Sequence, residues 1–149
     1  MRRVLIVIGL LLLPAMAQRL EVSAGSPYGL NLGIRTTLLP LIDLRLYGGG
    51  YPLSGSFVFG GGADVLASIP LTDFYAGAGG FYGNGPTVSG VNQGTAGARV
   101  VLGTNFGLGL IGAVLPASIF AELHPMAFFP SAGMLFGIGG SVGVSFKLP

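Results

Sequence analysis

Few residues of this sequence could do chemistry, and most of those are charged. Charged residues make up 8% of the chain, against about 25% in ordinary soluble domains. Seven of them alternate with apolar neighbours and are the candidates for a site: Glu21, Arg35, Asp43, Arg45, Asp64, Arg99 and Glu122. Charges turned away from water must pair, because a lone buried charge is costly. The pattern therefore predicts an ion-pair network, and the alternative is a narrow, water-filled pore.

A single histidine gives the only hint of catalysis. His124 shares its alternating phase with Ser118 and Glu122, and these three residue types can build a nucleophilic site. Successive residues on one face of a strand are about 6.8 Å apart, so a contact between Glu122 and His124 needs extended rotamers. No further motif supports catalysis. We expect a hydrogen-bonded interior histidine in a protein that is not an enzyme.

The remaining composition argues against several other classes of site. The chain has no cysteine, which removes disulfides and thiolate metal sites, and one histidine does not make a zinc site. From residue 18 onward, five basic residues balance five acidic ones, so no basic surface is available to bind phosphates. We therefore expect no metal, no cofactor and no nucleic-acid partner.

These charges must be positioned by elements with a period of two. In residues 30–47, Leu30, Leu32 and Ile34 share one phase and Asn31, Gly33 and Arg35 share the other; similar alternation recurs in eight stretches. The period of two is typical of strands. Two long uncharged segments, 100–121 and 126–146, could instead form membrane helices with G-x-x-x-G packing, but the alternation favours strands.

Turn signals separate the eight expected strands. Leu39-Pro40-Leu41 and Ile69-Pro70-Leu71 are near copies, Leu115-Pro116-Ala117 is similar, and longer loops rich in Gly, Ser and Asn lie at 26–29, 48–56, 84–95 and 126–132. Short turns alternating with longer loops are typical of outer-membrane barrels. We therefore predict an all-β fold, a transmembrane antiparallel up-and-down barrel of eight strands in outer-membrane lipid.

The first residues have the pattern of a secretory signal peptide, 1–17. Arg2 and Arg3 precede an apolar run over residues 4–14 and the small-x-small sequence Ala15-Met16-Ala17. The run is shorter than the about 20 residues of a membrane helix, so cleavage is expected rather than an anchor. Residues 18–149 would then form a single barrel domain.

Aromatic residues near the expected loops and turns predict interfacial girdles. Aromatic girdles flank the apolar band of outer-membrane barrels at both interfaces. The candidates are Tyr28, Tyr47, Tyr51, Phe74, Tyr75, Tyr82, Phe128 and Phe129.

One register can be predicted from a turn. If the hairpin is symmetric about Leu39, Arg35 and Asp43 face each other directly on neighbouring strands, within reach of a bidentate ion pair. Arg45 could then reach Asp43 or Asp64. We expect the Arg35–Asp43 pair inside the barrel.

The eight strands, the signal peptide and the glycine-rich end after residues 118–123 resemble the small outer-membrane barrels of the OmpA-like and opacity-protein-like superfamily. The resemblance is architectural and covers residues 18–149. It implies a cell outer-membrane location, insertion by the barrel assembly machinery, and a structural or surface role. A porin-like small-solute pore and a lipid-modifying barrel enzyme are the alternatives. Members usually end in an aromatic residue, whereas Phe146 is followed here by Lys147-Leu148-Pro149.

Overall fold

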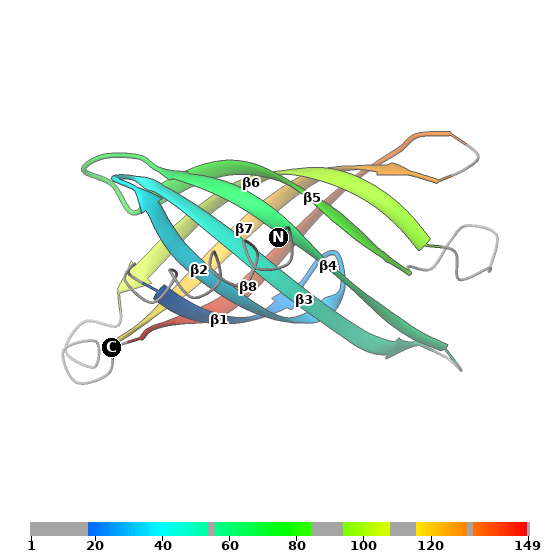
Figure 1. Cartoon of the computed structure of the whole chain (residues 1–149), viewed down its shortest axis with the longest axis horizontal. Helices are drawn as coiled ribbons and strands as arrows, with labels where there is room; N and C mark the ends of the chain where they lie inside the picture. Colours follow the sequence, from blue (N-terminus) through cyan, green and yellow to red (C-terminus); the bar gives the residue numbers. More distant parts are fainter. Residues whose placement is uncertain (1–17, 54–55, 85–93, 108–115, 131–132, 149) are drawn as a thin grey trace, which may run out of the picture.

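The protein is all-β and forms one closed antiparallel barrel (Figure 1). Its structure is a computed structural model, which describes residues 18–53, 56–84, 94–107, 116–130 and 133–148. The strands are β1 (Gln18–Gly25), β2 (Gly29–Leu39), β3 (Ile42–Leu53), β4 (Ser56–Ser68), β5 (Phe74–Asn84), β6 (Gly94–Gly107), β7 (Ala117–Phe129) and β8 (Leu135–Lys147). Each strand pairs with its neighbours in sequence, and β1 pairs with β8 to close the wall.

The predicted alternation decides which side chains face inward. On β2, Leu30, Leu32 and Ile34 are 62%, 57% and 50% exposed, whereas Asn31 and Arg35, in the other phase, are buried. The described parts of the segments 100–121 and 126–146 belong to β6, β7 and β8 rather than to helices. Within the described residues, no helix has the length and apolar character needed to cross a membrane.

The two near-identical turns have the same backbone geometry. Leu41 and Leu71, the third residues of the two copies, adopt φ angles of 68° and 65°. A positive φ after a proline is typical of a type II turn, in which glycine usually occupies that position. The third copy begins at Leu115, outside the described residues. Several strands are longer than predicted, because residues 48–53 continue β3 and residues 126–129 continue β7.

The β2–β3 hairpin corrects the predicted register. Asp43 lies opposite Thr37, and Arg35 lies opposite Arg45. Leu39 pairs with Ile42, so the turn is centred on Pro40-Leu41 rather than on Leu39, and an irregularity between Thr37 and Leu39 then shifts the pairing by one residue. An extra residue on one strand of a hairpin moves every later partner, so the assumption of a symmetric hairpin was wrong.

The interior contains two apolar clusters. One consists of Tyr28, Val58, Phe81 and Met126, and the other of Leu66, Tyr75 and Val101. Along β4, Asp64 comes between Leu66 of the second cluster and Val58 of the first. The same order recurs on β6, where Arg99 lies between Val101 and Gly97, whose backbone adjoins Phe81. Asp64 and Arg99 therefore lie between the two clusters, whereas Asp43 lies level with Leu66 of the second cluster.

Candidate functional site

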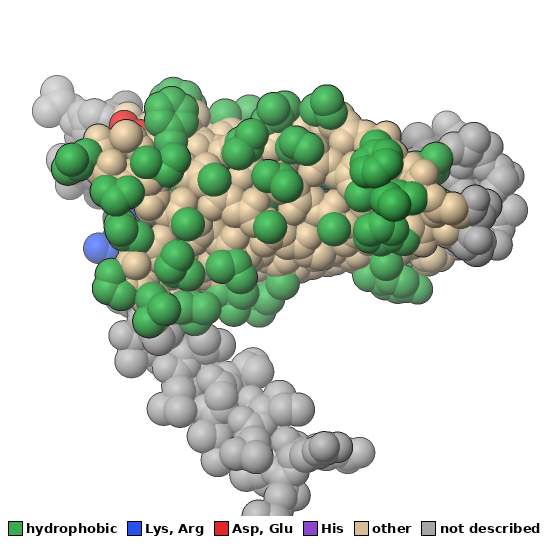
Figure 2. Space-filling view, turned by 90° about the horizontal axis from the view of Figure 1, so that it is seen from above, with side chains coloured by type: hydrophobic (Ala, Val, Ile, Leu, Met, Phe, Trp, Pro, Cys, Tyr) green, Lys and Arg blue, Asp and Glu red, His purple; other side chains and the backbone are tan. Residues whose placement is uncertain are grey.

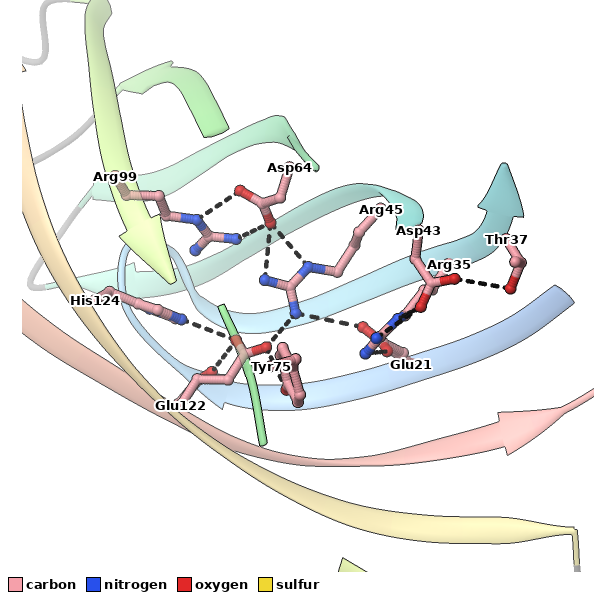
Figure 3. Close-up of polar contacts among 11 residues, drawn as sticks. Glu21, Arg35, Thr37, Asp43, Arg45, Asp64, Tyr75, Arg99, Glu122 and His124 are labelled. Atoms are coloured by element: carbon pink, nitrogen blue, oxygen red, sulfur yellow. Dashed lines mark hydrogen bonds and ion pairs between the residues drawn. The ribbon is translucent and has the colours of Figure 1, made fainter. Parts of the chain in front are cut away.

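The charged side chains predicted to share a face do converge inside the barrel (Figure 3). All seven are buried. With Tyr75 and Ser141, they give the network at least one member from every strand: Glu21 from β1, Arg35 from β2, Asp43 and Arg45 from β3, Asp64 from β4, Tyr75 from β5, Arg99 from β6, Glu122 and His124 from β7, and Ser141 from β8. The network thus links the whole circumference of the wall.

Arg45 is the centre of this network. Its Nη1 lies 2.6 Å from Glu122 Oε1 and 3.5 Å from Glu21 Oε2. On the other side, its Nε and Nη2 each lie 2.8 Å from Asp64 Oδ2. One guanidinium therefore connects carboxylates from β1, β4 and β7. Its planar arrangement of donors suits this role better than a lysine ammonium would.

Asp64 also binds a second guanidinium. Arg99 donates from Nε to Asp64 Oδ1 at 2.9 Å and from Nη2 to Oδ2 at 2.6 Å. This is a bidentate pair, the geometry that fixes arginine and carboxylate most firmly. The Arg99 guanidinium also stacks over the Tyr47 ring, 4.2 Å from its centroid, which adds a cation–π contact.

The predicted partner of Arg35 is correct even though the register is not. Arg35 Nε and Nη2 both lie 2.7 Å from Asp43 Oδ2. Thr37, which faces Asp43 directly, donates its hydroxyl to Oδ1 at 2.7 Å. The long arginine side chain spans the diagonal between the two strands, and its guanidinium lies 4.7 Å from the Tyr75 ring centroid.

Glu122 receives most of its hydrogen bonds from residues that the charge pattern alone did not single out. Tyr75 donates its hydroxyl to Oε1 at 2.7 Å, and Ser141 donates to Oε2 at 3.2 Å. His124 Nε2 lies 2.8 Å from Oε2. Tyr75 and Ser141 are in the inward phase of their strands, so the alternation would have found them had it been applied to uncharged residues.

The geometry does not assemble a nucleophilic site from the described residues. Ser118 lies opposite Gly107 and Ser145, and the serine nearest in the network binds Glu122 rather than His124. A nucleophile needs a direct hydrogen bond to its base. His124 is 1% exposed, which leaves a substrate no approach. In the part of the chain that the structure describes, no group of three or more metal-binding side chains is present.

The girdle prediction is wrong for five of its eight aromatic residues. Tyr28 and Tyr75 are buried at 3% and 2% exposure. Tyr47, Tyr51 and Phe128 pack against the interior cluster around Tyr28. Proximity to a loop was the wrong criterion, because the phase along the strand decides the face. Burial raises the pKa of Tyr28, in the β1–β2 turn, to about 12.

The outer face carries aromatic residues near both ends of the barrel. Phe74, Tyr82 and Phe129, the other three candidates, are 59%, 64% and 47% exposed. Further exposed aromatic residues accompany them: Phe57, Phe59 and Phe136 lie at the end of Tyr82, and Phe106 and Phe146 at the end of Phe74. These five were missed because the loops, rather than the outward phase, guided the choice.

The interior as a whole is built for mutual satisfaction of charges. Four carboxylates face three guanidiniums and one imidazole, and ion pairs or hydrogen bonds join all of them.

Comparisons with models of protein families, with curated proteins and with solved structures give no match for this chain. The geometry alone therefore carries the functional argument.

Proposed function

We propose that this chain is an integral outer-membrane barrel with a structural or surface role, that its wall lies in lipid and that its interior is closed. The observation that carries the proposal is the inverted distribution of side chains. Apolar residues point outward and stay exposed, while the charged network is buried. In a soluble domain, by contrast, large apolar side chains are the ones most often buried.

Exposed large apolar side chains occur on all eight strands. Hydrophobic side chains are spread along the length of the outer face and gather toward its two ends, and the charged side chains visible in this view lie at one end (Figure 2). A soluble monomer rarely exposes a contiguous apolar patch larger than a few hundred Å². A closed barrel also satisfies its backbone without water, which is the condition for crossing a bilayer with strands.

Two features favour a closed interior over a pore. Arg45 joins β3 to β1, β4 and β7 through ion pairs across the interior, and Tyr28 folds inward against Phe81 with ring centroids 6.1 Å apart. A barrel of eight strands has an interior just wide enough for side chains to fill. Among the described residues, no contact favours the small-solute pore or the lipid-modifying enzyme.

The cellular parts of the proposal come from the sequence. Residues 1–17 would be removed as a signal peptide and would direct the chain across the inner membrane. The barrel would then be inserted by the assembly machinery, as in the OmpA-like and opacity-protein-like superfamily that the sequence resembles. Residues 1–17 lie outside those that the structure describes.

A single outward arginine tests the membrane location. Val142, in the middle of β8, is 60% exposed. In lipid, Val142→Arg should cost about 2–4 kcal/mol near the midplane and should deplete the folded form from outer-membrane fractions. The full chain is expressed, membranes are separated by density, and folding is read from heat-dependent migration in SDS gels.

A matched control separates lipid from water. Leu71 is fully exposed in the β4–β5 turn, so Leu71→Arg should leave assembly unchanged. If Val142→Arg is tolerated as well as Leu71→Arg, the wall faces water and the membrane proposal is wrong. Planar-bilayer recordings of the wild type test closure separately, because steady conductance steps would support the pore instead.

A further inference from the structure

A small polar cavity lies inside the barrel beside the charged network. Its lining combines Glu21, Ser23, Asn31, Tyr47, His124 and Ser141 with the guanidiniums of Arg45 and Arg99. The cavity leaves about 20 Å³ for the centres of water-sized molecules, and about 10–15 Å³ is enough to hold one water. A larger ligand does not fit.

Four of the lining side chains have a buried polar atom without a hydrogen-bond partner among the described residues. One is Arg45 Nη2, which still lies 2.8 Å from Asp64 Oδ2 in an ion pair. The other three are Asn31 Oδ1, the Tyr47 hydroxyl and His124 Nδ1. Asn31 and His124 are 6% and 1% exposed, so bulk water does not satisfy them. Leaving such an atom unsatisfied destabilises the fold, because the atom loses the hydrogen bonds that it makes to water in the unfolded chain.

Glu21 adds an acceptor with spare capacity at the same cavity. It is 4% exposed, yet its two ion pairs are long, 3.8 Å to Arg35 Nη1 and 3.5 Å to Arg45 Nη1. A carboxylate offers about four lone-pair sites, and these contacts do not use them all. The lining therefore presents acceptors, a hydroxyl that can donate, and a carboxylate around a space the size of water.

We infer that this cavity is a water-binding site, occupied by one or two ordered waters that complete the ion-pair network. Water is the one ligand that both donates and accepts at this size, as the mixed lining requires. It receives a hydrogen bond from the Tyr47 hydroxyl and donates to Asn31 Oδ1, His124 Nδ1 or Glu21. The Nε2–H of His124 then donates to Glu122, which fixes the tautomer of the ring.

Two single-hydroxyl deletions provide a matched test. Tyr47→Phe removes a hydroxyl that lines the cavity and keeps the ring beneath Arg99. Ser145→Ala removes a hydroxyl that is also buried and without a partner, at 3% exposure, but does not line the cavity. If water occupies the cavity, Tyr47→Phe lowers the midpoint of urea unfolding, whereas Ser145→Ala leaves it unchanged or raises it.

The wild-type protein gives a second readout that does not depend on a variant folding. His124 is the only histidine, so its ring signals are unambiguous in an isotope-labelled sample in detergent micelles. We expect magnetisation transfer from bound water to the His124 ring protons, reduced in Tyr47→Phe and retained in Ser145→Ala.

The proposal is wrong if wild-type His124 shows no transfer from water. It is also wrong if Tyr47→Phe shifts the unfolding midpoint in the same direction as Ser145→Ala, because an empty cavity would make both hydroxyls equally unsatisfied. Neither result bears on the membrane proposal, which the outward arginine tests.

Discussion

The inner and outer faces of the same strands follow opposite chemical rules. On β6, Arg99 points inward and is 5% exposed, while its neighbour Val100 points outward and is 45% exposed. The inner face needs particular partners at particular distances, because each buried charge must be matched. The outer face needs only apolar character. Substitutions that are equivalent in size should therefore have unequal effects on the two sides of the wall.

Glycine shows the same contrast. A side chain at Gly60, on the inner face of β4, would meet the Tyr28 ring. At Gly48, on the outer face of neighbouring β3, the nearest atom is a carbonyl oxygen 3.6 Å from the position of an added Cβ. Gly60 therefore makes room for the aromatic cluster, whereas Gly48 has space for a side chain.

The largest loss of stability should come from a substitution on the inner face, Arg45→Leu. The change leaves Asp64, Glu122 and Glu21 buried without their shared guanidinium, and removing one partner from a buried network costs about 3–5 kcal/mol. Urea unfolding in detergent, followed by heat-dependent gel migration, measures the loss.

Lys147→Leu is the control for Arg45→Leu. Lys147 is exposed at the end of β8, where water reaches the charge, so its loss should change the unfolding free energy little. Equal losses for the two variants would show that the interior charges are no more important than an exposed one.

A smaller difference should separate two glycine substitutions. Gly60→Val should destabilise by about 1–3 kcal/mol through overpacking against Tyr28, while Gly48→Val should be neutral or stabilising, since valine favours strands. The same unfolding assay gives both values. A Gly48→Val variant that is the less stable of the two would reverse the assignment of faces.

The smallest effect concerns alkaline pH. Because burial raises the pKa of Tyr28 to about 12, its phenol favours the folded state while neutral; that contribution is complete below about pH 10 and is lost as the pH rises through about 12. The Tyr28→Phe variant should therefore lose less of its unfolding free energy than the wild type as the pH rises through about 12. Tyr82→Phe, at a 64% exposed position, should not, and an identical alkaline limb in all three proteins would contradict the burial of Tyr28.

The alternation of residue types predicted the strands and their faces because burial on one side of a strand has a strict period of two. The same logic placed Arg35 and Asp43 inside together. It failed for the register, because the centre of the turn at Pro40-Leu41 and the irregularity between Thr37 and Leu39 depend on turn geometry and not on hydropathy. The predicted ion pair still forms, because the Arg35 side chain is long enough to reach Asp43 diagonally across the two strands.

The aromatic residues illustrate a different limit. Tyr75 lies in the inward phase of β5, next to outward Phe74, yet both were assigned to a girdle by their distance from a turn. The position of Tyr28 could not be predicted at all from a period, because it belongs to a turn that folds into the barrel. Its partners, Phe81 and Gly60, come from strands on other parts of the wall.

The pairing of β1 with β8 joins the two ends of the described chain. Leu148 N donates to Gln18 O at 2.9 Å, so a short linker could connect these residues without disturbing the wall. Circular permutants opened at the β2–β3 turn should then close the same barrel with a new order of strands.

In the natural order of strands, the barrel closes only when β8 pairs with β1, which is the contact with the greatest separation in sequence. Topologies with such distant contacts fold slowly. Until β8 arrives, β1 has an unpaired edge that could pair with another chain, which makes the timing of closure a point of vulnerability during biogenesis.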